Sequence, residues 1–373
     1  MGDGTKRVGY WRRYDAKYRT CNVEKLYSFI LSKARKLGAP FERKSRKGRP
    51  FVLSPCEYAA TFIIATLFDL SLRDIEWFSD VIAGVHADHS TFGKAFAKIP
   101  VSYLNKLLFM TRNEIYNAIN ETPVLIADST GVVVDRTYRE IVVKCKKRMV
   151  HVYDKLHIIV EYYPDAGIMV VAHARAHSHS DANTAVHMLH EMEVAGERFF
   201  ADAGYDAEQL YETCYKRGLQ PLIKMRRSTA NPKKYRRKAW NTFDHELYKS
   251  YRGVIEGVFG GLQTRRLLFS RYRGENMRAK HIIAMAIVQN LHTYMAILCI
   301  ILICSTTPVT PYKCSSMNAR KYTIGNFHLS TIWMKKSVPE ERTPSPFIMM
   351  VCYPFTGIVE SDMILKRLPI SYP

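Results

Sequence analysis

The stretch RFFADAGYDAEQLYE, residues 198–212, contains an apolar run that stops abruptly at a carboxylate. Residues 199–201 are apolar or aromatic, which is typical of a short buried strand, and Asp202 follows directly. From Asp206 onward, the spacing of the apolar residues predicts a helix. A single carboxylate at the end of a buried strand indicates little, but it indicates a functional site if other segments of the chain place further carboxylates beside it.

Two other segments supply carboxylates in comparable positions. PVLIADSTGVVV, residues 123–134, is a β-rich run, and we expect its strand to end at Asp128. YRGVIEGVFGGLQTRR, residues 251–266, has a helical pattern in which Glu256 shares a face with Arg252, four positions earlier. Two such strands lying side by side would bring the aspartates to one edge of a sheet, where the helix would add the glutamate.

Three converging carboxylates repel one another unless a cation lies among them. Oxygen ligands suit Mg²⁺ or Mn²⁺. Two such ions, roughly 3.5–4 Å apart, can activate a water or a 3′-hydroxyl and stabilise the leaving oxygen of a phosphodiester. We therefore expect Asp128, Asp202 and Glu256 to be catalytic and to hold two Mg²⁺ or Mn²⁺ ions, with Arg252 holding a phosphate or orienting the glutamate.

Each carboxylate also has a plain structural explanation when it is taken alone. Asp128 could begin a turn, Asp202 could terminate a strand, and Glu256 could form a surface ion pair of little energetic value. The three in this order on strand, strand and helix favour a catalytic centre. Two other acidic residues are interpreted as helix caps: Asp181 as an N-cap, and Asp206 in a capping box.

The charge of the chain points to a polyanionic partner. Its 373 residues carry a formal net charge of +21, with a pI near 9.6, while 47% of them are hydrophobic. This composition is typical of a globular protein, and the excess of positive charge favours nucleic acid over an acidic membrane surface. The eight cysteines lack zinc spacing and are interpreted as reduced thiols of a cytoplasmic, nucleoid-associated protein.

The pattern along the chain divides it into four parts. Residues 1–50 are basic and are interpreted as an arm or linker. Residues 51–120 contain two capping boxes and read as short helices, either a helix-turn-helix-like module that binds DNA ends or a plain helical bundle. Residues 121–304 alternate strands and helices, which predicts a mixed α/β sheet with helices packed on it. Residues 305–373 hold half of the prolines and are expected to be poorly ordered.

Within residues 121–304, the turn 164–167 predicts a hairpin, and helices are expected at about 247–265 and 281–303. The run AILCIILIC, residues 296–304, is too short to span a bilayer, and the polar flank upstream of it predicts a buried helix. We expect no membrane association.

A second basic feature lies between the strand near 220 and the glutamate helix. From Lys216 to Lys238 the chain has ten Lys or Arg and no acidic residue, which is typical of a loop on a DNA backbone, although a solvated charged loop is the alternative. Trp240 follows, and we expect it to be a core residue rather than a base-stacking one. The predicted DNA contacts in this segment are Lys224, Arg226, Arg227, Lys233, Lys234, Arg236, Arg237 and Lys238.

The motifs LIADSTGV and DAGYD, together with the Arg–Glu pair four residues apart, resemble the DDE transposases of the insertion-sequence four/five superfamily. The resemblance spans about residues 50–299 and implies an RNase H-like catalytic domain. It also implies a DNA contact seven residues after Glu256. There this chain has Gln263 where the family has Lys.

This resemblance implies a DNA transposase that cuts the element's ends and joins the 3′-hydroxyl to target DNA. Its partners would be double-stranded DNA, at the terminal inverted repeats and the target, and a second copy of the chain in a homodimer. Two alternatives are an RNase H-like metal-dependent nuclease without strand transfer and a catalytically decayed DNA-binding remnant.

Overall fold

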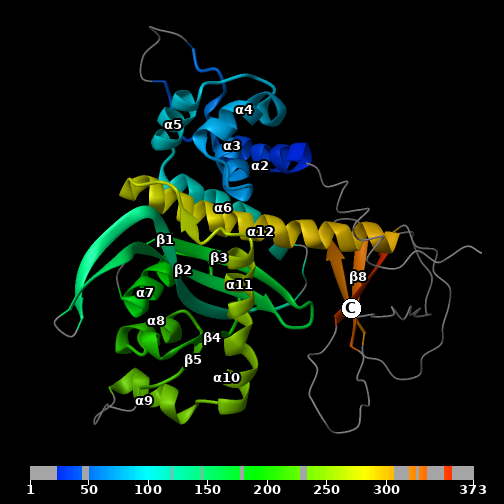
Figure 1. Ribbon diagram of the computed structural model, residues 1–373. Coiled ribbons are helices and arrows are strands. Elements are labelled where there is room, and N and C mark those ends of the chain that lie inside the picture. The colour runs from blue at the N-terminus through cyan, green and yellow to red at the C-terminus, as the bar shows by residue number, and fades with distance from the viewer. Residues whose placement is uncertain are drawn as a thin grey trace, which may run out of the picture.

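The computed structural model describes residues 23–43, 50–117, 119, 121–143, 146–176, 180–226, 233–305, 319–324, 327–333 and 348–354. A mixed sheet forms its centre, and helices cover both faces of this sheet (Figure 1). Helix α12 (Glu275–Ser305) runs between the sheet and a group of N-terminal helices.

The central sheet has the strand order β3-β2-β1-β4-β5. Its first three strands pair antiparallel, β4 pairs parallel with β1, and β5 pairs parallel with β4. A short sixth strand also pairs with β1. This topology confirms the RNase H-like α/β class expected from the sequence. The strands are β1 (Val124–Val143), β2 (Lys146–Tyr163), β3 (Ile168–Ala176), β4 (Arg198–Ala201), β5 (Gln220–Ile223) and β6 (Phe269–Ser270).

Alternation along the strands builds one apolar core on each face of the sheet, because successive side chains point to opposite faces. In β1, Ile126 belongs to one core, while Leu125 and Ala127 belong to the other. In β4, Phe200 and Phe199 divide in the same way.

Helices α7 (Asp181–Glu191), α8 (Glu208–Lys216) and α9 (Lys234–Asn241) cover the face of Leu125. The face of Ile126 is covered by α6 (Val101–Tyr116), α12, and the segment that holds Glu256. That segment was expected to be one helix. It consists of α10 (His245–Arg252), a 3₁₀ turn η2 (Gly253–Ile255) and α11 (Glu256–Thr264).

Helix α12 forms where the sequence predicts a helix and is buried from Lys280 to Leu291, whereas the burial of residues 298–304, most of the run expected to be buried, lies outside what the structure describes. The side-chain amide of Asn290 makes two hydrogen bonds to the backbone of Val171 in β3. Its Oδ1 accepts from the Val171 N–H at 2.8 Å, and its Nδ2 donates to the Val171 carbonyl at 2.9 Å. This contact lies beside the irregularity between Ile159 and Val160 in the β2–β3 pairing, where the backbone needs a partner outside the ladder. At its other end, Lys280 donates to the carbonyl of Ala97 at 2.7 Å.

The N-terminal helices begin where the sequence predicts. Ser54 with Glu57 and Ser71 with Asp74 form the two expected capping boxes. An additional helix lies in the part interpreted as an arm or linker, because its apolar side chains, including Ile30, pack against the core. The helices are α2 (Val23–Leu37), α3 (Pro55–Leu67), α4 (Leu72–Ala83) and α5 (His89–Lys98).

In the part expected to be poorly ordered, the structure describes an antiparallel three-stranded sheet. The strands are rich in β-branched and aromatic residues, and seven of the eight prolines of this part lie outside them. The expectation of poor order was based on the number of prolines in the whole segment, which does not show that most of them lie between the strands. The strands are β7 (Ala319–Ile324), β8 (Phe327–Trp333) and β9 (Ile348–Pro354).

Within the described ranges, no single helix is long and apolar enough to cross a membrane. The pair Pro55–Leu67 and Leu72–Val81 passes by length and composition, but these two helices meet at a bend of 115°.

Candidate active site

Asp128 and Asp202 lie beside each other on adjacent parallel strands. Ile126 of β1 pairs with Phe200 of β4, and each aspartate follows its own member of this pair by two residues. Asp202 directly follows β4, as the sequence predicts. Asp128 does not end its strand, because β1 continues to Val143 in a long hairpin with β2. It lies instead level with the end of the parallel neighbour β4, so that Asp128 and Asp202 still meet at one edge of the sheet.

The carboxylate of Asp202 is fixed by the turn that follows it. Its Oδ1 accepts a hydrogen bond of 2.8 Å from the backbone N–H of Gly204, within the 3₁₀ turn η1 (Ala203–Tyr205). A methyl group on Gly204 would lie 2.9 Å from this oxygen and 3.5 Å from Oδ2 of Asp181. Two carboxylates therefore approach the same glycine, which has no side chain to keep them apart.

Asp128 is largely buried among other charges. Its Oδ1 accepts from the backbone N–H of Ser129 at 2.8 Å, and its Oδ2 lies 3.2 Å from Nη2 of Arg252. Burial raises the pKa of Asp128 above its ordinary value, and the negative charges of Asp202 and Asp181 add to this rise. The Ser129 N–H and the Arg252 guanidinium oppose it without cancelling it.

Arg252 connects Asp128 to Glu256. It is the last residue of α10, and its Nη1 lies 3.8 Å from Oε1 of Glu256, the first residue of α11. The side chain of Glu256 is 75% exposed, whereas that of Asp128 is 15% exposed. The glutamate therefore stands at the rim of the aspartate pair and faces solvent.

Asp181 belongs to this cluster, although the sequence was interpreted as placing it at a helix cap. The N-cap of α7 is Ser180, and Asp181 is the first helical residue. Its Oδ1 accepts from Ser129 Oγ at 3.0 Å and from Lys155 Nζ at 3.0 Å, and Nδ1 of His157 lies 3.4 Å from it. The signal for this role is the His-Ser-Asp triplet at 179–181, of which His179 lies outside the described residues.

A buried tyrosine completes the cluster. Tyr205 lies in η1, and burial raises the pKa of its hydroxyl well above the ordinary value, assisted by the charges of Asp128, Asp181 and Asp202. The hydroxyl therefore stays protonated and can only add a neutral oxygen to the group. Closely spaced carboxylates with oxygen atoms around them fit Mg²⁺ or Mn²⁺, because a hard cation would relieve the repulsion between these carboxylates, which adds to the effect of burial on the pKa of Asp128.

Two of the arginines predicted to contact DNA make contacts within the protein. Arg236 is buried, and its guanidinium makes two 2.8 Å bonds to the carboxylate of Asp206. Asp206 thus forms no capping box, and α8 has Ala207 at its N-cap. Arg226 donates from Nε to the carbonyl of Ala203 at 2.7 Å, and both arginines therefore stabilise the turn that carries Asp202.

The other predicted DNA contacts lie at the surface wherever the structure describes them. Trp240 is also 60% exposed, so the expectation of a core tryptophan is wrong; Arg236 and Ala239 are the residues that α9 buries. Arg227 lies outside the described residues. The exposed candidates are Lys224, Lys233, Lys234, Arg237, Lys238 and Gln263, and Arg226 is exposed as well.

Comparison with known proteins finds a family that matches the segment containing these residues. Residues 119–291 match the family of the transposase DDE domain. This matched DDE domain runs from before β1 into α12 and contains the three aspartates, Arg252 and Glu256.

Two individual proteins are also similar to this chain. An uncharacterized protein of Aquifex aeolicus (strain VF5) is 27% identical over 272 residues, which is 68% of this chain and 83% of that protein. The cryo-EM structure of a piggyBac transposase synaptic complex with hairpin DNA aligns over 75% of this chain and 74% of its own, at 10% identity and a TM-score of 0.34.

Proposed function

We propose that this chain is a DNA transposase of the insertion-sequence four/five superfamily. It would cut DNA at the ends of its element and join the resulting 3′-hydroxyl to target DNA. The observation that carries this proposal is the convergence of Asp128, Asp202 and Asp181 at one sheet edge, inside the segment that matches the transposase DDE domain.

The carboxylates of Asp128, Asp202 and Glu256 would hold two Mg²⁺ or Mn²⁺ ions. When bound, these ions would supply Lewis-acid activation of a nucleophilic oxygen and charge stabilisation of the leaving oxygen. Asp128 and Asp202 are positioned for this role by backbone donors that occupy one oxygen of each. Glu256, at the exposed rim, can adjust its position when DNA and ions enter.

Arg252 would bind a phosphate oxygen of the DNA. Its Nη2 faces Asp128, while its Nη1 is buried and has no hydrogen-bond partner in the part of the chain that the structure describes. A buried guanidinium N–H without a partner is costly, and a phosphate oxygen would satisfy it.

DNA would be held by the positive charge of the chain and by exposed basic residues of α9 and the strand before it, with Gln263 on α11 as a further contact. We propose that the N-terminal helices recognise the terminal inverted repeats. Because joining needs two ends together, a homodimer on DNA would be the working form, acting in the nucleoid-containing cytoplasm.

The test is cleavage and joining on DNA that carries the inverted repeats flanking the gene. Asp128→Asn, Asp202→Asn or Glu256→Gln should each abolish Mg²⁺-dependent cleavage and leave DNA binding measurable. Glu246→Gln is the matched control, because this carboxylate is on α10 and its side chain is 85% exposed.

Two outcomes would contradict the proposal, and each would indicate a different function. If pre-cut ends are never joined while cleavage persists, the chain is a metal-dependent nuclease. If the wild-type chain binds the ends but neither cuts nor joins them with Mg²⁺ or Mn²⁺, it is a DNA-binding remnant.

A further inference from the structure

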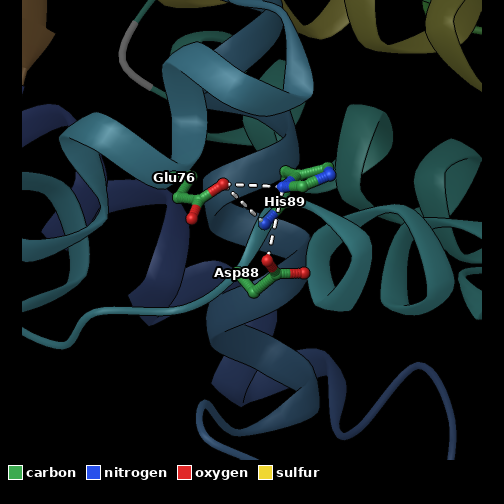
Figure 2. A group of neighbouring side chains, drawn as sticks. All are labelled: Glu76, Asp88 and His89. Carbon is green, nitrogen blue, oxygen red and sulfur yellow. Dashed lines mark hydrogen bonds and ion pairs between the residues drawn. The ribbon is translucent and has the colours of Figure 1, made fainter.

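A second cluster of metal-ligating side chains lies far along the sequence from the DDE residues, in the turn between α4 and α5. The segment HADH, residues 86–89, places two histidines and an aspartate within four positions, and Glu76 reaches them from α4. Figure 2 shows Glu76 and Asp88 approaching His89 from two sides. We propose that Glu76, His86, Asp88 and His89 form a binding site for Zn²⁺ or a similar first-row divalent ion.

The ligand atoms are already close together. Nδ1 of His89 lies 2.7 Å from Oε2 of Glu76 and 3.3 Å from Oδ2 of Asp88. Nε2 of His86 lies 4.0 Å from the other Glu76 oxygen. Zinc ligands lie about 2.0–2.2 Å from the ion, which sets tetrahedral ligand atoms about 3.3–3.6 Å apart. The ligand atoms of Glu76, Asp88 and His89 all lie within 4.8 Å of one another, so small side-chain rotations would complete the site.

The charges of this cluster favour a cation. In the described part of the chain, the ion pairs of Glu76, Asp80 and Asp88 are made only with His86 and His89. Arg73 lines the same hollow as Glu76 and His89, but it forms no ion pair with these three carboxylates in the described part of the chain. The three carboxylates therefore share only two histidines, in a protein that otherwise has a large excess of Lys and Arg. A divalent ion would remove this repulsion.

The backbone holds the ligands in place. One oxygen of Asp88 caps α5 by accepting from the N–H of Ser90 at 2.8 Å, which leaves the other oxygen directed at His89. Ser79 of α4 accepts from the N–H of Ala87 at 3.2 Å and holds the segment that carries the histidines against α4.

The donor set distinguishes this site from the DDE cluster. Two imidazoles with two carboxylates suit Zn²⁺, Co²⁺ or Ni²⁺, whereas Mg²⁺ prefers oxygen ligands alone. The side chains of His86 and His89 are 64% and 42% exposed, so an ion can enter from solvent. Bound there, the ion would tie α4 to the start of α5 and fix the angle between these two helices.

The competing explanation is that Glu76 simply anchors His89, since it also accepts from the His89 backbone N–H at 3.2 Å. Metal titration of the full chain separates the two. We would use the Asp128→Asn/Asp202→Asn double variant, so that the DDE cluster contributes little binding, and measure Zn²⁺ stoichiometry and the visible spectrum with Co²⁺. The expected result is one ion per chain, a tetrahedral Co²⁺ spectrum and a Tm that rises with Zn²⁺.

Two substitutions in this background identify the ligands without removing the fold. Asp88→Asn keeps a good N-cap but loses the anionic oxygen, and His86→Ala removes an exposed ring. Each should weaken Zn²⁺ binding at least tenfold, in the range seen when metal-site residues are altered, while the Tm in chelator stays that of the parent. Absence of Zn²⁺ binding, or binding that neither substitution weakens, would overturn the proposal.

Discussion

Nη2 of Arg252 lies 3.2 Å from Oδ2 of Asp128, and the same guanidinium reaches toward Glu256. The arginine therefore joins the buried carboxylate on β1 to the exposed carboxylate on α11. It compensates the charge of Asp128, and its Nη1 is buried without a hydrogen-bond partner among the described residues, which is the group that we propose binds a DNA phosphate.

Replacing Arg252 should slow chemistry more than binding. Arg252→Ala removes the donor that we propose binds the reacting phosphate, and loss of one such donor reduces the rate about 10²–10³-fold. Arg252→Lys should recover only part of this rate, because an ammonium lacks the planar fork of the guanidinium. Single-turnover cleavage measures the effect, with Lys249→Ala on the same helix as the control. A cleavage rate of Arg252→Ala equal to that of the control would show that Arg252 has no role at the phosphate.

Asp128→Asn should stabilise the metal-free protein at neutral pH. Because the folded pKa of Asp128 is raised, its contribution to stability is complete below the unfolded pKa, about 3.9, and is lost as the pH rises through the folded value. The Tm advantage of the variant should therefore be largest at neutral pH and shrink on acidification. Thermal melts with chelator test this. Addition of Mg²⁺ should then raise the Tm of the wild type more than that of the variant. A variant that melts below the wild type at neutral pH would mean that the Arg252 ion pair outweighs the burial of Asp128.

Asp181→Asn should change the pH dependence of cleavage. The negative charge of Asp181 contributes to the raised pKa of Asp128, so its removal should lower that pKa and move the acid limb of the pH–rate profile to lower pH. A purely structural role would reduce the rate without moving the limb. Glu193→Gln, just beyond α7, is the matched control because its side chain is exposed.

Gly204→Ala should disturb the carboxylates without unfolding the domain. The added methyl group would lie 2.9 Å from Oδ1 of Asp202, so this carboxylate must rotate away. We expect weaker Mn²⁺ binding and cleavage reduced at least tenfold. Gly260→Ala is the control, since nothing lies within 4 Å of its added methyl group, and alanine there should stabilise α11 by about 1 kcal/mol. Equal Mn²⁺ affinities in the two variants would contradict the arrangement.

Neutralising Lys224, Lys233, Lys234 and Lys238 together should reduce the dependence of log affinity on log salt. The slope should fall by roughly 0.9 for each DNA phosphate that the variant no longer neutralises. Lys216→Ala, whose partner is Glu212 on the same helix, is the surface control. Arg236→Ala should instead lower the free energy of unfolding by about 3–5 kcal/mol, because it leaves the buried carboxylate of Asp206 without a countercharge and with only its hydrogen bonds from Tyr211 and the Arg226 N–H. An unchanged salt slope in the lysine variant would mean that these residues do not bind the DNA backbone.

Much of this protein follows from local signals in its sequence. The capping boxes at Ser54 and Ser71, and the apolar run that ends at Asp202, each depend on residues within a few positions of one another. Such signals act through nearby backbone groups, so the chain far away does not alter them. The order of strands and helices then leaves few ways to build the sheet, and the adjacency of the strands of Asp128 and Asp202 follows.

Only the tertiary structure decided which charged residues face one another. Asp181 and Asp206 both read as caps, yet Asp181 joins the aspartate cluster and Asp206 binds Arg236, in each case through partners distant in the sequence. The exposure of Trp240 and the packing of the helix at residues 23–37 likewise depended on whether a part of the chain distant in sequence covers them. A side chain's burial and its ion-pair partner are properties of the packed chain, because both the desolvation and the opposing charge come from other elements.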